Sequence, residues 1–325
     1  MVDVGQYPSA ATAAADEAHV DWTDADPRDD AICTSSFAAC ELQRYLRRVT
    51  GVSKGLAIAD DDSLPAGDLI LVGGPDANRA TARLAPDLGP TGAVLAGRGP
   101  EGYVVRSFRD RGRSIVVLAG VTRVGTLHAA YDFLERAGVR WFAPGSVHEE
   151  VPSRPWPQVA AVSAVESPQF VTRGFHAWED RGDPEFFEWM ARNRLNTWCV
   201  EEDERPLLHK LGISLAAGGH GLTARVLDPR APYPYAHRRV HGTGSLPADP
   251  YPVSPEFAGD ANHDGRLSYF EAHPEWYGLK RGRRSSNIDG DRGDNFCTSN
   301  GDAVSEWAKN IVAISPPVPT ATPTS

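Results

Sequence analysis

The chain reads Gln169-Phe-Val-Thr-Arg-Gly-Phe-His-Ala-Trp178, then Leu195-Asn-Thr-Trp-Cys-Val-Glu-Glu202, then Ile213-Ser-Leu-Ala-Ala-Gly-Gly-His-Gly221. These are three short apolar runs, each bounded by glycine or polar residues, and helical patterns separate them. Such an alternation is typical of βαβαβ units with parallel strands. The stretch therefore predicts an α/β fold in which three strands lie side by side and point the same way.

The connection between the first two runs has the features of a helix. Asp183 can cap its first turn, Pro184 suits the first helical position, and the pattern continues to Asn193. The connection between the second and third runs is a shorter helical piece that stops at Gly212.

Each of the three strands ends in side chains that can bind or react. Parallel α/β folds meet their ligands at the carboxyl ends of the strands. These ends carry His176 and Trp178, then Glu201 and Glu202, then His220. His220 stands between glycines, which allow a ligand to approach the backbone closely.

Two carboxyl groups on opposite sides of a glycosidic bond are the usual requirement for its hydrolysis. Glu201 and Glu202 are candidates for this chemistry, and a solvated cluster of acids at a helix start is the alternative. Histidines can hydrogen-bond sugar hydroxyls, and Trp178 or Trp198 could stack on a pyranose ring or belong to the core. His237 and His241 have zinc-like spacing but lack the helix and glutamate of a metalloprotease motif, so we discount them.

Composition narrows the class of partner. The 325 residues are 41% hydrophobic and 23% charged, with a net charge of −10. This balance disfavours nucleic acid and anionic membranes as partners, because phosphate binding needs positive charge.

Residues 1–28 lack the basic start and apolar core of a secretory signal, and we expect them to form a disordered leader. The sequence is also compatible with an extracellular or periplasmic parent protein. The four cysteines are too sparse for a disulfide scaffold, and we expect free thiols.

The first half of the chain predicts a second α/β arrangement. We expect a strand ending at 31–33, a helix over 36–49, and a buried strand over 68–74. Strands over 102–108 and 114–119 flank a turn and are expected to pair antiparallel, and a helix follows over 122–137. Near the other end of the chain we expect strands over 275–280 and 295–298 and a helix ending at Ile314, whose apolar stripe is Val304, Trp307, Ala308 and Ile311.

Residues 260–271 read Asp-Ala-Asn-His-Asp-Gly-Arg-Leu-Ser-Tyr-Phe-Glu and fit the twelve-residue EF-hand loop. Hard oxygen ligands at loop positions one, three, five, seven, nine and twelve suit Ca²⁺. These positions hold Asp260, Asn262, Asp264, Arg266 through its carbonyl, Ser268 and Glu271. Because only one loop is present, the sequence favours a structural ion over a sensor. A solvated acidic loop is the alternative, since prolines crowd both flanks.

Several segments together resemble bacterial alpha-glucuronidases and hexosaminidase-like glycosidases. Their N-terminal domain is matched by Glu41-Leu-Gln-Arg-Tyr-Leu-Arg-Arg-Val-Thr-Gly51, Leu69-Ile-Leu-Val-Gly-Gly74, Gly125 to Gly145 with its Tyr-Asp-Phe-Leu-Glu segment, and Glu150-Val-Pro152. The opening half of the (β/α)8 barrel that follows is matched by Arg173-Gly-Phe175, Met190 to Asn196, Gly218-Gly-His220, His273-Pro-Glu-Trp-Tyr277 and Cys297-Thr-Ser-Asn300.

The resemblance implies an accessory α/β domain packed on a barrel that binds or cleaves carbohydrate, including uronic-acid-bearing polysaccharide. Composition and the resemblance together predict a leader 1–28, an accessory domain 29–152, a linker 153–168, a partial barrel 169–314 with an insertion 222–272, and a Pro/Thr-rich tail 315–325. Arg173, His176, Trp178 and His220 would bind the sugar. The stretch 168–325 is shorter than the roughly 200 residues of a complete barrel, so we expect the family's acid and base on later strands.

Two function classes therefore remain open. The first is a glycoside-hydrolase-like protein with a structural calcium ion. The second is a non-catalytic carbohydrate-binding or calcium-stabilised structural module. Turnover of a glycoside separates the first class from the second.

Overall fold

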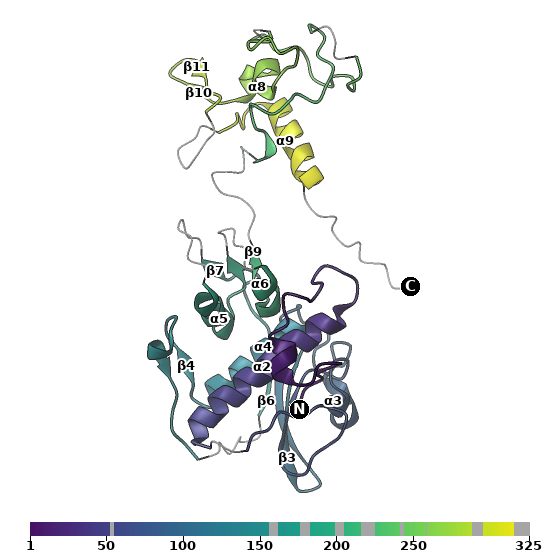
Figure 1. Cartoon of the computed structure of the whole chain (residues 1–325), viewed down its shortest axis with the longest axis vertical. Coiled ribbons are helices and arrows are strands. Elements are labelled where there is room, and N and C mark those ends of the chain that lie inside the picture. Colours follow the sequence, from purple (N-terminus) through teal and green to yellow (C-terminus); the bar gives the residue numbers. More distant parts are fainter. Residues whose placement is uncertain are drawn as a thin grey trace. The chain divides into compact units, whose positions relative to one another are not determined.

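The computed structural model describes residues 1–52, 55–155, 162–175, 183–198, 205–215, 225–240, 244–257, 259–287 and 295–314. The chain divides into two compact units, Met1–Ala216 and Ala217–Ser325, both mixtures of helices and small sheets (Figure 1). The general α/β class expected from the sequence is confirmed. Within the described part of the chain, no helix is both long and apolar enough to cross a membrane.

A four-stranded sheet forms the centre of the first unit, in the order β1 (Leu69–Val72), β3 (Arg113–Gly120), β2 (Tyr103–Asp110), β6 (Ser163–Glu166). β2 and β3 form the expected antiparallel hairpin, and β1 runs parallel to β3. The turn of the hairpin needs left-handed backbone, with φ of +49° at Arg111 and +87° at Gly112. The apolar residues that pair across β1, β2 and β3 are buried on both faces of the sheet.

Two long helices cover one face of this sheet, α2 (Pro27–Thr50) and α4 (Arg123–Arg136) (Figure 1). The opposite face packs against the segment that holds α3 (Arg79–Leu84) and the 3-10 turn η1 (Pro86–Leu88). Successive side chains of β2 point to opposite faces of the sheet. Tyr103 and Val105 therefore pack against α2 and α4, whereas Val104 packs against the segment of α3 and η1.

Helix α2 is longer than the sequence predicted, and the strand expected at 31–33 is wrong. Asp26 caps the helix by accepting a hydrogen bond from the Arg28 backbone N–H, and Pro27 occupies its first turn. Cys33 is fully buried within the helix. A short apolar run is ambiguous between strand and helix, and here the upstream cap decided for helix.

Residues 1–28, for which the composition suggested a disordered leader, are folded onto the first unit. Val2 pairs with Asp60 in a parallel bridge, and helix α1 (Ala10–Ala14) packs on α2. Val2 and Ala13 are completely buried. The alanines that made this stretch look featureless are small enough to let α1 approach α2 closely.

Several short elements complete the two units. The first unit adds a hairpin of β4 (Arg140–Trp141) and β5 (Glu149–Glu150), joined through the 3-10 turn η2 (Ser146–His148). The second unit contains α8 (Tyr269–Ala272), the 3-10 turn η3 (Pro274–Trp276), the hairpin of β10 (Leu279–Lys280) and β11 (Arg283–Arg284), and α9 (Gly301–Ile314).

The three strands predicted to be parallel pair as expected. β7 (Gly174–Phe175), β8 (Thr197–Trp198) and β9 (Ser214–Leu215) form one parallel sheet in that order. Helices α5 (Pro184–Arg192) and α6 (Arg205–Leu211) connect them. Gly174 is required here, because an added Cβ would lie 1.8 Å from the Thr197 carbonyl oxygen.

This small sheet belongs to the first compact unit, so the boundary expected at 153–168 lies inside that unit. A buried ion-pair network joins α5 to α2. The Arg192 Nε atom lies 2.8 Å from Glu41 Oε2, and its Nη2 lies 2.7 Å from Glu188 Oε2. Glu149 of β5 is 3.8 Å from the same guanidinium, and the Arg192 side chain is only 5% exposed.

Two local expectations for the second unit are wrong. The strand expected over 275–280 is the turn η3 followed by β10, because Pro274 starts a turn that leaves only Leu279 and Lys280 extended. Helix α9 has the expected end, and Trp307 of the expected stripe packs against the core, but Ala303 and Glu306 are its buried residues, whereas Val304 is 40% exposed. The buried side of α9 therefore lies one position before the expected stripe, and it carries the Glu306 carboxylate, which accepts hydrogen bonds from tyrosine hydroxyls.

Arg192→Met should destabilise the first unit strongly, because it removes the buried cation that Glu41, Glu149 and Glu188 share. Glu41 and Glu149 would then keep only the more exposed Arg44 and Arg48 as ion-pair partners. Loss of one partner from a buried pair costs about 3–5 kcal/mol. Urea unfolding followed by tryptophan fluorescence measures this loss. Arg106→Met is the matched control, since Arg106 pairs with Asp87 at the surface, where the two side chains are 38% and 53% exposed; such pairs contribute no more than about 1 kcal/mol. Equal, small losses for both variants would contradict the structural role of the network.

Candidate functional site

The carboxyl ends of β7, β8 and β9 are the site predicted from the sequence. The three strands are parallel neighbours, so their carboxyl ends lie at the same edge of the sheet. The candidates on those segments are His176, Trp178, Glu201, Glu202 and His220, and all five lie outside the described residues. The structure therefore describes the scaffold of this site and leaves the roles of these side chains as predictions.

Arg173 is the one predicted sugar-binding residue that the structure describes, and its guanidinium is engaged by the protein. Nε donates to the Arg194 carbonyl oxygen at 2.9 Å, and Nη1 donates to that of Phe170 at 2.7 Å. Nη2 forms an ion pair with Glu101. With all three nitrogens bonded, the geometry favours a structural role that holds the start of β7.

Glu101 completes this arrangement and was missed by sequence reasoning. It accepts a hydrogen bond from Asn196 Nδ2 at 2.6 Å, and Asn196 Oδ1 in turn accepts the Arg173 backbone N–H at 2.8 Å. Glu101 lies between Pro100 and Gly102 in a loop without a recognisable motif. Nothing in the linear pattern connects it to residues more than seventy positions away.

Trp198, which could have stacked on a sugar, is a core residue. It is 1% exposed, and its ring packs edge-on against Phe186 and Phe187 at centroid distances of 5.0 and 5.9 Å. The apolar face of α5 thus covers β8. The core alternative for this tryptophan is confirmed.

The predicted calcium loop, residues 260–271, has its carboxylates turned toward its own backbone. Asp260 Oδ2 accepts from the Gly265 N–H at 2.7 Å, and Asp264 Oδ1 accepts from the Arg266 N–H at 2.8 Å. Asn262 Oδ1 accepts from the Asp264 N–H at 3.0 Å. Gly265 takes φ of +79°, the left-handed conformation that the sharp turn needs.

The end of the loop starts helix α8. Glu271 Oε2 accepts from the Ser268 N–H at 2.8 Å, while Ser268 caps the helix, a reciprocal capping box. Glu271 Oε1 reaches back to the Ala261 N–H at 3.0 Å. Glu271 thereby closes the loop onto its own beginning, although the loop carboxylates are not gathered as closely as the cluster Asp3, Asp60 and Asp61, which is the one such group among the described residues.

A buried polar core supports this loop in the second unit. Glu306 is completely buried and accepts hydrogen bonds from three tyrosine hydroxyls, those of Tyr235 (2.8 Å), Tyr251 (2.9 Å) and Tyr269 (2.8 Å). Burial, and then the neighbouring carboxylate, raises the pKa of Tyr235 and of Tyr251. The hydroxyls therefore stay protonated and serve as donors that satisfy the buried charge.

A second hydrogen-bonded chain links two further carboxylates. Asp249 Oδ1 accepts from the Tyr233 hydroxyl at 2.8 Å, and that hydroxyl lies 2.9 Å from His273 Nε2. His273 Nδ1 lies 2.9 Å from Glu275 Oε1, and its ring stacks on Trp276 at 4.1 Å. The arrangement connects the end of α8 to the segment before the loop.

His237 is buried in the same unit and does not belong to a metal site among the described residues. Its ring stacks on Phe257 at a centroid distance of 4.3 Å. Burial lowers its pKa, with the nearby Asp249 carboxylate opposing that effect. His241 lies outside the described residues, so the zinc interpretation stays discounted on its sequence context.

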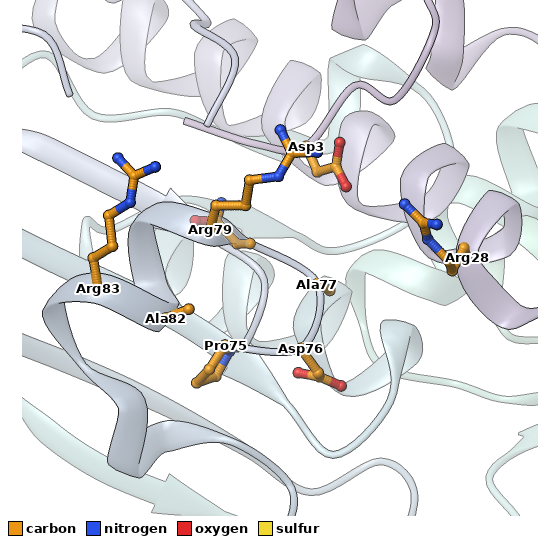
Figure 2. Close-up of a pocket in the computed structure, with 9 residues that line it drawn as sticks. Asp3, Arg28, Pro75, Asp76, Ala77, Arg79, Ala82 and Arg83 are labelled. Carbon is orange, nitrogen blue, oxygen red and sulfur yellow. The ribbon is translucent and has the colours of Figure 1, made fainter. Parts of the chain in front are cut away.

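A surface pocket of about 430 Å³ lies between the N-terminal segment, the start of α2 and the α3 region (Figure 2). Its lining is strongly charged, with Asp3, Arg28, Asp76, Arg79 and Arg83. None of the residues predicted from the sequence lines it. Such a lining differs from the apolar and aromatic lining that pockets for small organic ligands usually have.

Comparison with models of known protein families found no match. Comparison with the sequences of curated proteins found no match either. The glycosidase-like interpretation therefore rests on the residues of the chain and on the parallel arrangement of β7, β8 and β9.

The Glu275 carboxyl should make the second unit sensitive to acid. Burial alone would raise its pKa, but hydrogen bonds from His273 and Ser254 prevail and hold the pKa below 4.5. A lowered carboxyl pKa contributes stability that is present above 4.5 and lost as the pH falls below that value. Hydrogen exchange of residues 267–277, measured across this range, should show this loss.

Glu275→Gln should flatten the dependence of that exchange on pH, because glutamine does not titrate. Asp302→Asn, which removes a carboxylate from the first turn of α9, is the control and should leave the dependence unchanged. An unaltered pH profile in Glu275→Gln would contradict the role of this carboxyl group.

Proposed function

We propose that the chain is carbohydrate-active and glycoside-hydrolase-like, of the alpha-glucuronidase-like kind. In this proposal a hexosaminidase-like N-terminal α/β domain is followed by the first strands of a (β/α)8 barrel. The sugar binds at the carboxyl ends of β7, β8 and β9. His176 and His220 bind hydroxyl or carboxylate oxygens, Trp178 stacks on the ring, and Glu201 and Glu202 are the candidate carboxylates.

The parallel pairing of β7, β8 and β9 is the observation that supports this proposal most directly. Segments after parallel strands converge at one edge of a sheet, where α/β enzymes bind their substrates. The first of these strands is held in place by the ion pair of Arg173 and Glu101. The positioning role of Arg173 replaces the direct sugar contact expected from the sequence.

We also propose a calcium ion in the loop 260–271, bound by Asp260, Asn262, Asp264, the Arg266 carbonyl, Ser268 and Glu271. Support comes from the loop closure by Glu271 and from the left-handed Gly265. The ion would attract the carboxylates that now accept backbone hydrogen bonds and would stiffen the connection to α8. Its role is structural, since the loop stands next to a core built from tyrosines and Glu306 rather than from exposed apolar surface.

A non-catalytic carbohydrate-binding or calcium-stabilised module is the second candidate function. The engagement of Arg173 and the self-contained polar core of the second unit favour it. The two candidates differ in turnover, because only the first predicts hydrolysis of a glycoside.

Glycan binding by the full chain tests the sugar site. Isothermal titration with glucuronic-acid-bearing oligosaccharides should show binding, and His220→Ala should weaken it about tenfold or more through loss of a hydrogen bond to the ligand. His19→Ala is the control, because His19 is 81% exposed and lies in the N-terminal segment. Absence of binding to any uronic-acid or neutral glycan would contradict the proposal, and release of an aryl aglycone would select the enzymatic candidate.

Calcium should raise the melting temperature of the second unit. A ligand present at 100 times its Kd adds about 2.7 kcal/mol to stability. Asp260→Ala should abolish this shift, because it removes the ligand at the first loop position, while Asp302→Ala outside the loop should retain it. Differential scanning calorimetry across a calcium titration measures the shift, and melting curves that do not move with calcium would count against the site.

A further inference from the structure

Three carboxylates meet in the first unit outside both proposed sites. Asp3, Asp60 and Asp61 each offer an oxygen, and these atoms all lie within 4.8 Å of one another. The backbone brings them together, since Val2 pairs with Asp60 and its N–H donates to the Ala59 carbonyl oxygen at 3.1 Å. The cluster therefore joins the N-terminal segment to a segment more than fifty residues away.

The burial of Asp61 distinguishes this cluster from an ordinary group of surface carboxylates. The side chain of Asp61 is 0% exposed. Oδ2 accepts the Arg79 backbone N–H at 2.5 Å, whereas Oδ1 is buried without any hydrogen-bond partner. A buried carboxylate oxygen that lacks a partner is costly, so this position calls for a positive group.

The positive charge that the chain itself supplies is insufficient. Arg79 Nη1 lies 3.8 Å from Asp61 Oδ1, beyond hydrogen-bond distance, and the same guanidinium forms a closer ion pair with Asp62. The Arg79 side chain is 55% exposed, and Figure 2 shows it extending toward Asp3. Asp3 and Asp60 form no ion pair within the described part of the chain, where they accept hydrogen bonds from the backbone N–H groups of Gly5 and Asp61. The Met1 amino group also interacts with Asp61, but burial lowers its pKa to about 6, so it carries little positive charge at neutral pH. Arg79 is thus the main positive charge beside four carboxylates.

We propose that Asp3, Asp60 and Asp61 bind a divalent cation of the calcium or magnesium type. Ligands that are all carboxylate oxygens suit hard cations rather than zinc or copper. Calcium–oxygen distances of about 2.3–2.6 Å place two ligands of one ion at most about 5 Å apart, which matches the spacing of the cluster. The ion occupies the space beside Asp61 Oδ1 and fastens the N-terminal segment to residues 59–61.

This site is independent of the loop 260–271, because it belongs to the other compact unit. The test therefore uses the full chain carrying Asp260→Ala, which removes the loop ligand. Calcium titration of this variant by calorimetry, repeated with magnesium, should show one bound ion. Hydrogen exchange of residues 1–5 and 57–62 should slow when the ion binds.

Adding Asp3→Asn to Asp260→Ala should weaken binding tenfold or more, and Asp3 is chosen because it is only half-buried. Asp61→Asn should act in the same direction. Asp62→Asn is the matched control, since Asp62 is 64% exposed and lies outside the cluster. The proposal would be overturned if the Asp260→Ala chain bound no ion. It would also be overturned if adding Asp3→Asn or Asp61→Asn left the affinity of the Asp260→Ala chain for the ion unchanged.

The design separates this inference from the calcium loop. If the loop binds no ion, the unmodified chain and Asp260→Ala bind the same number of ions, and the effect of Asp3→Asn still decides the cluster. If the cluster binds no ion, Asp260→Ala removes all binding. Each result supports or overturns one of the two sites without reference to the other.

Discussion

The buried contact between Arg192 and Glu41 is the interaction on which the first unit depends. Glu41 belongs to α2, Glu149 to β5 and Glu188 to α5, so one guanidinium joins three elements. Taking these charges out of water is costly, and they are tolerated only because each carboxylate meets a donor. The Glu149 carboxylate also accepts from Tyr45 and Arg48, both at 2.5 Å. Apolar packing alone would allow α2, α5 and β5 to shift relative to one another, whereas these directional hydrogen bonds and ion pairs fix one relative position of the three elements.

This arrangement determines where a sugar site can be. Helix α5 is fixed on α2 by Arg192, and the side chains on its other face, Phe186 and Phe187, cover β8 through Trp198. β7 is then held by Arg173 and Glu101, with Asn196 between them. The scaffold of the parallel sheet is thus built by polar bonds at its start and apolar contacts along its length, and the proposed ligand-binding segments begin where these contacts end.

The second unit is also held together by hydrogen bonds to a buried carboxylate, but its core is aromatic. It has few apolar residues in regular elements, and its largest buried side chains are aromatic, with Trp276 and Tyr277 completely buried. Tyrosines bring hydroxyls into the interior, and Glu306 gives three of them an acceptor. A core of this kind is specified by hydrogen bonds and depends on each partner being present. A calcium ion in the adjoining loop would add a further constraint to a unit that contains little helix or sheet.

Local signals in the sequence were sufficient for several elements and for the parallel arrangement of β7, β8 and β9. The cap at Asp183, the hairpin turn at 111–112 and the alternation of apolar runs predicted α5, the β2–β3 pair and the parallel set β7, β8 and β9. These features depend on neighbours within a few residues or on periodicity, so the linear pattern contains them. Where the pattern was ambiguous, as at 31–33, the prediction failed because a cap several residues upstream decided the structure.

Only the tertiary structure decided which charged residues belong together. The sequence suggested that the Arg173 guanidinium binds a sugar. In the structure it pairs with Glu101, seventy-two positions away, and holds the start of β7. The pairing of Arg192 with Glu41 spans 151 positions, and the joining of Asp3 to Asp60 and Asp61 depends on the N-terminal segment folding back. The physical reason is the same in each case. Burial and electrostatic pairing depend on distance in space, and no local pattern of residue types encodes which distant charge will be the neighbour.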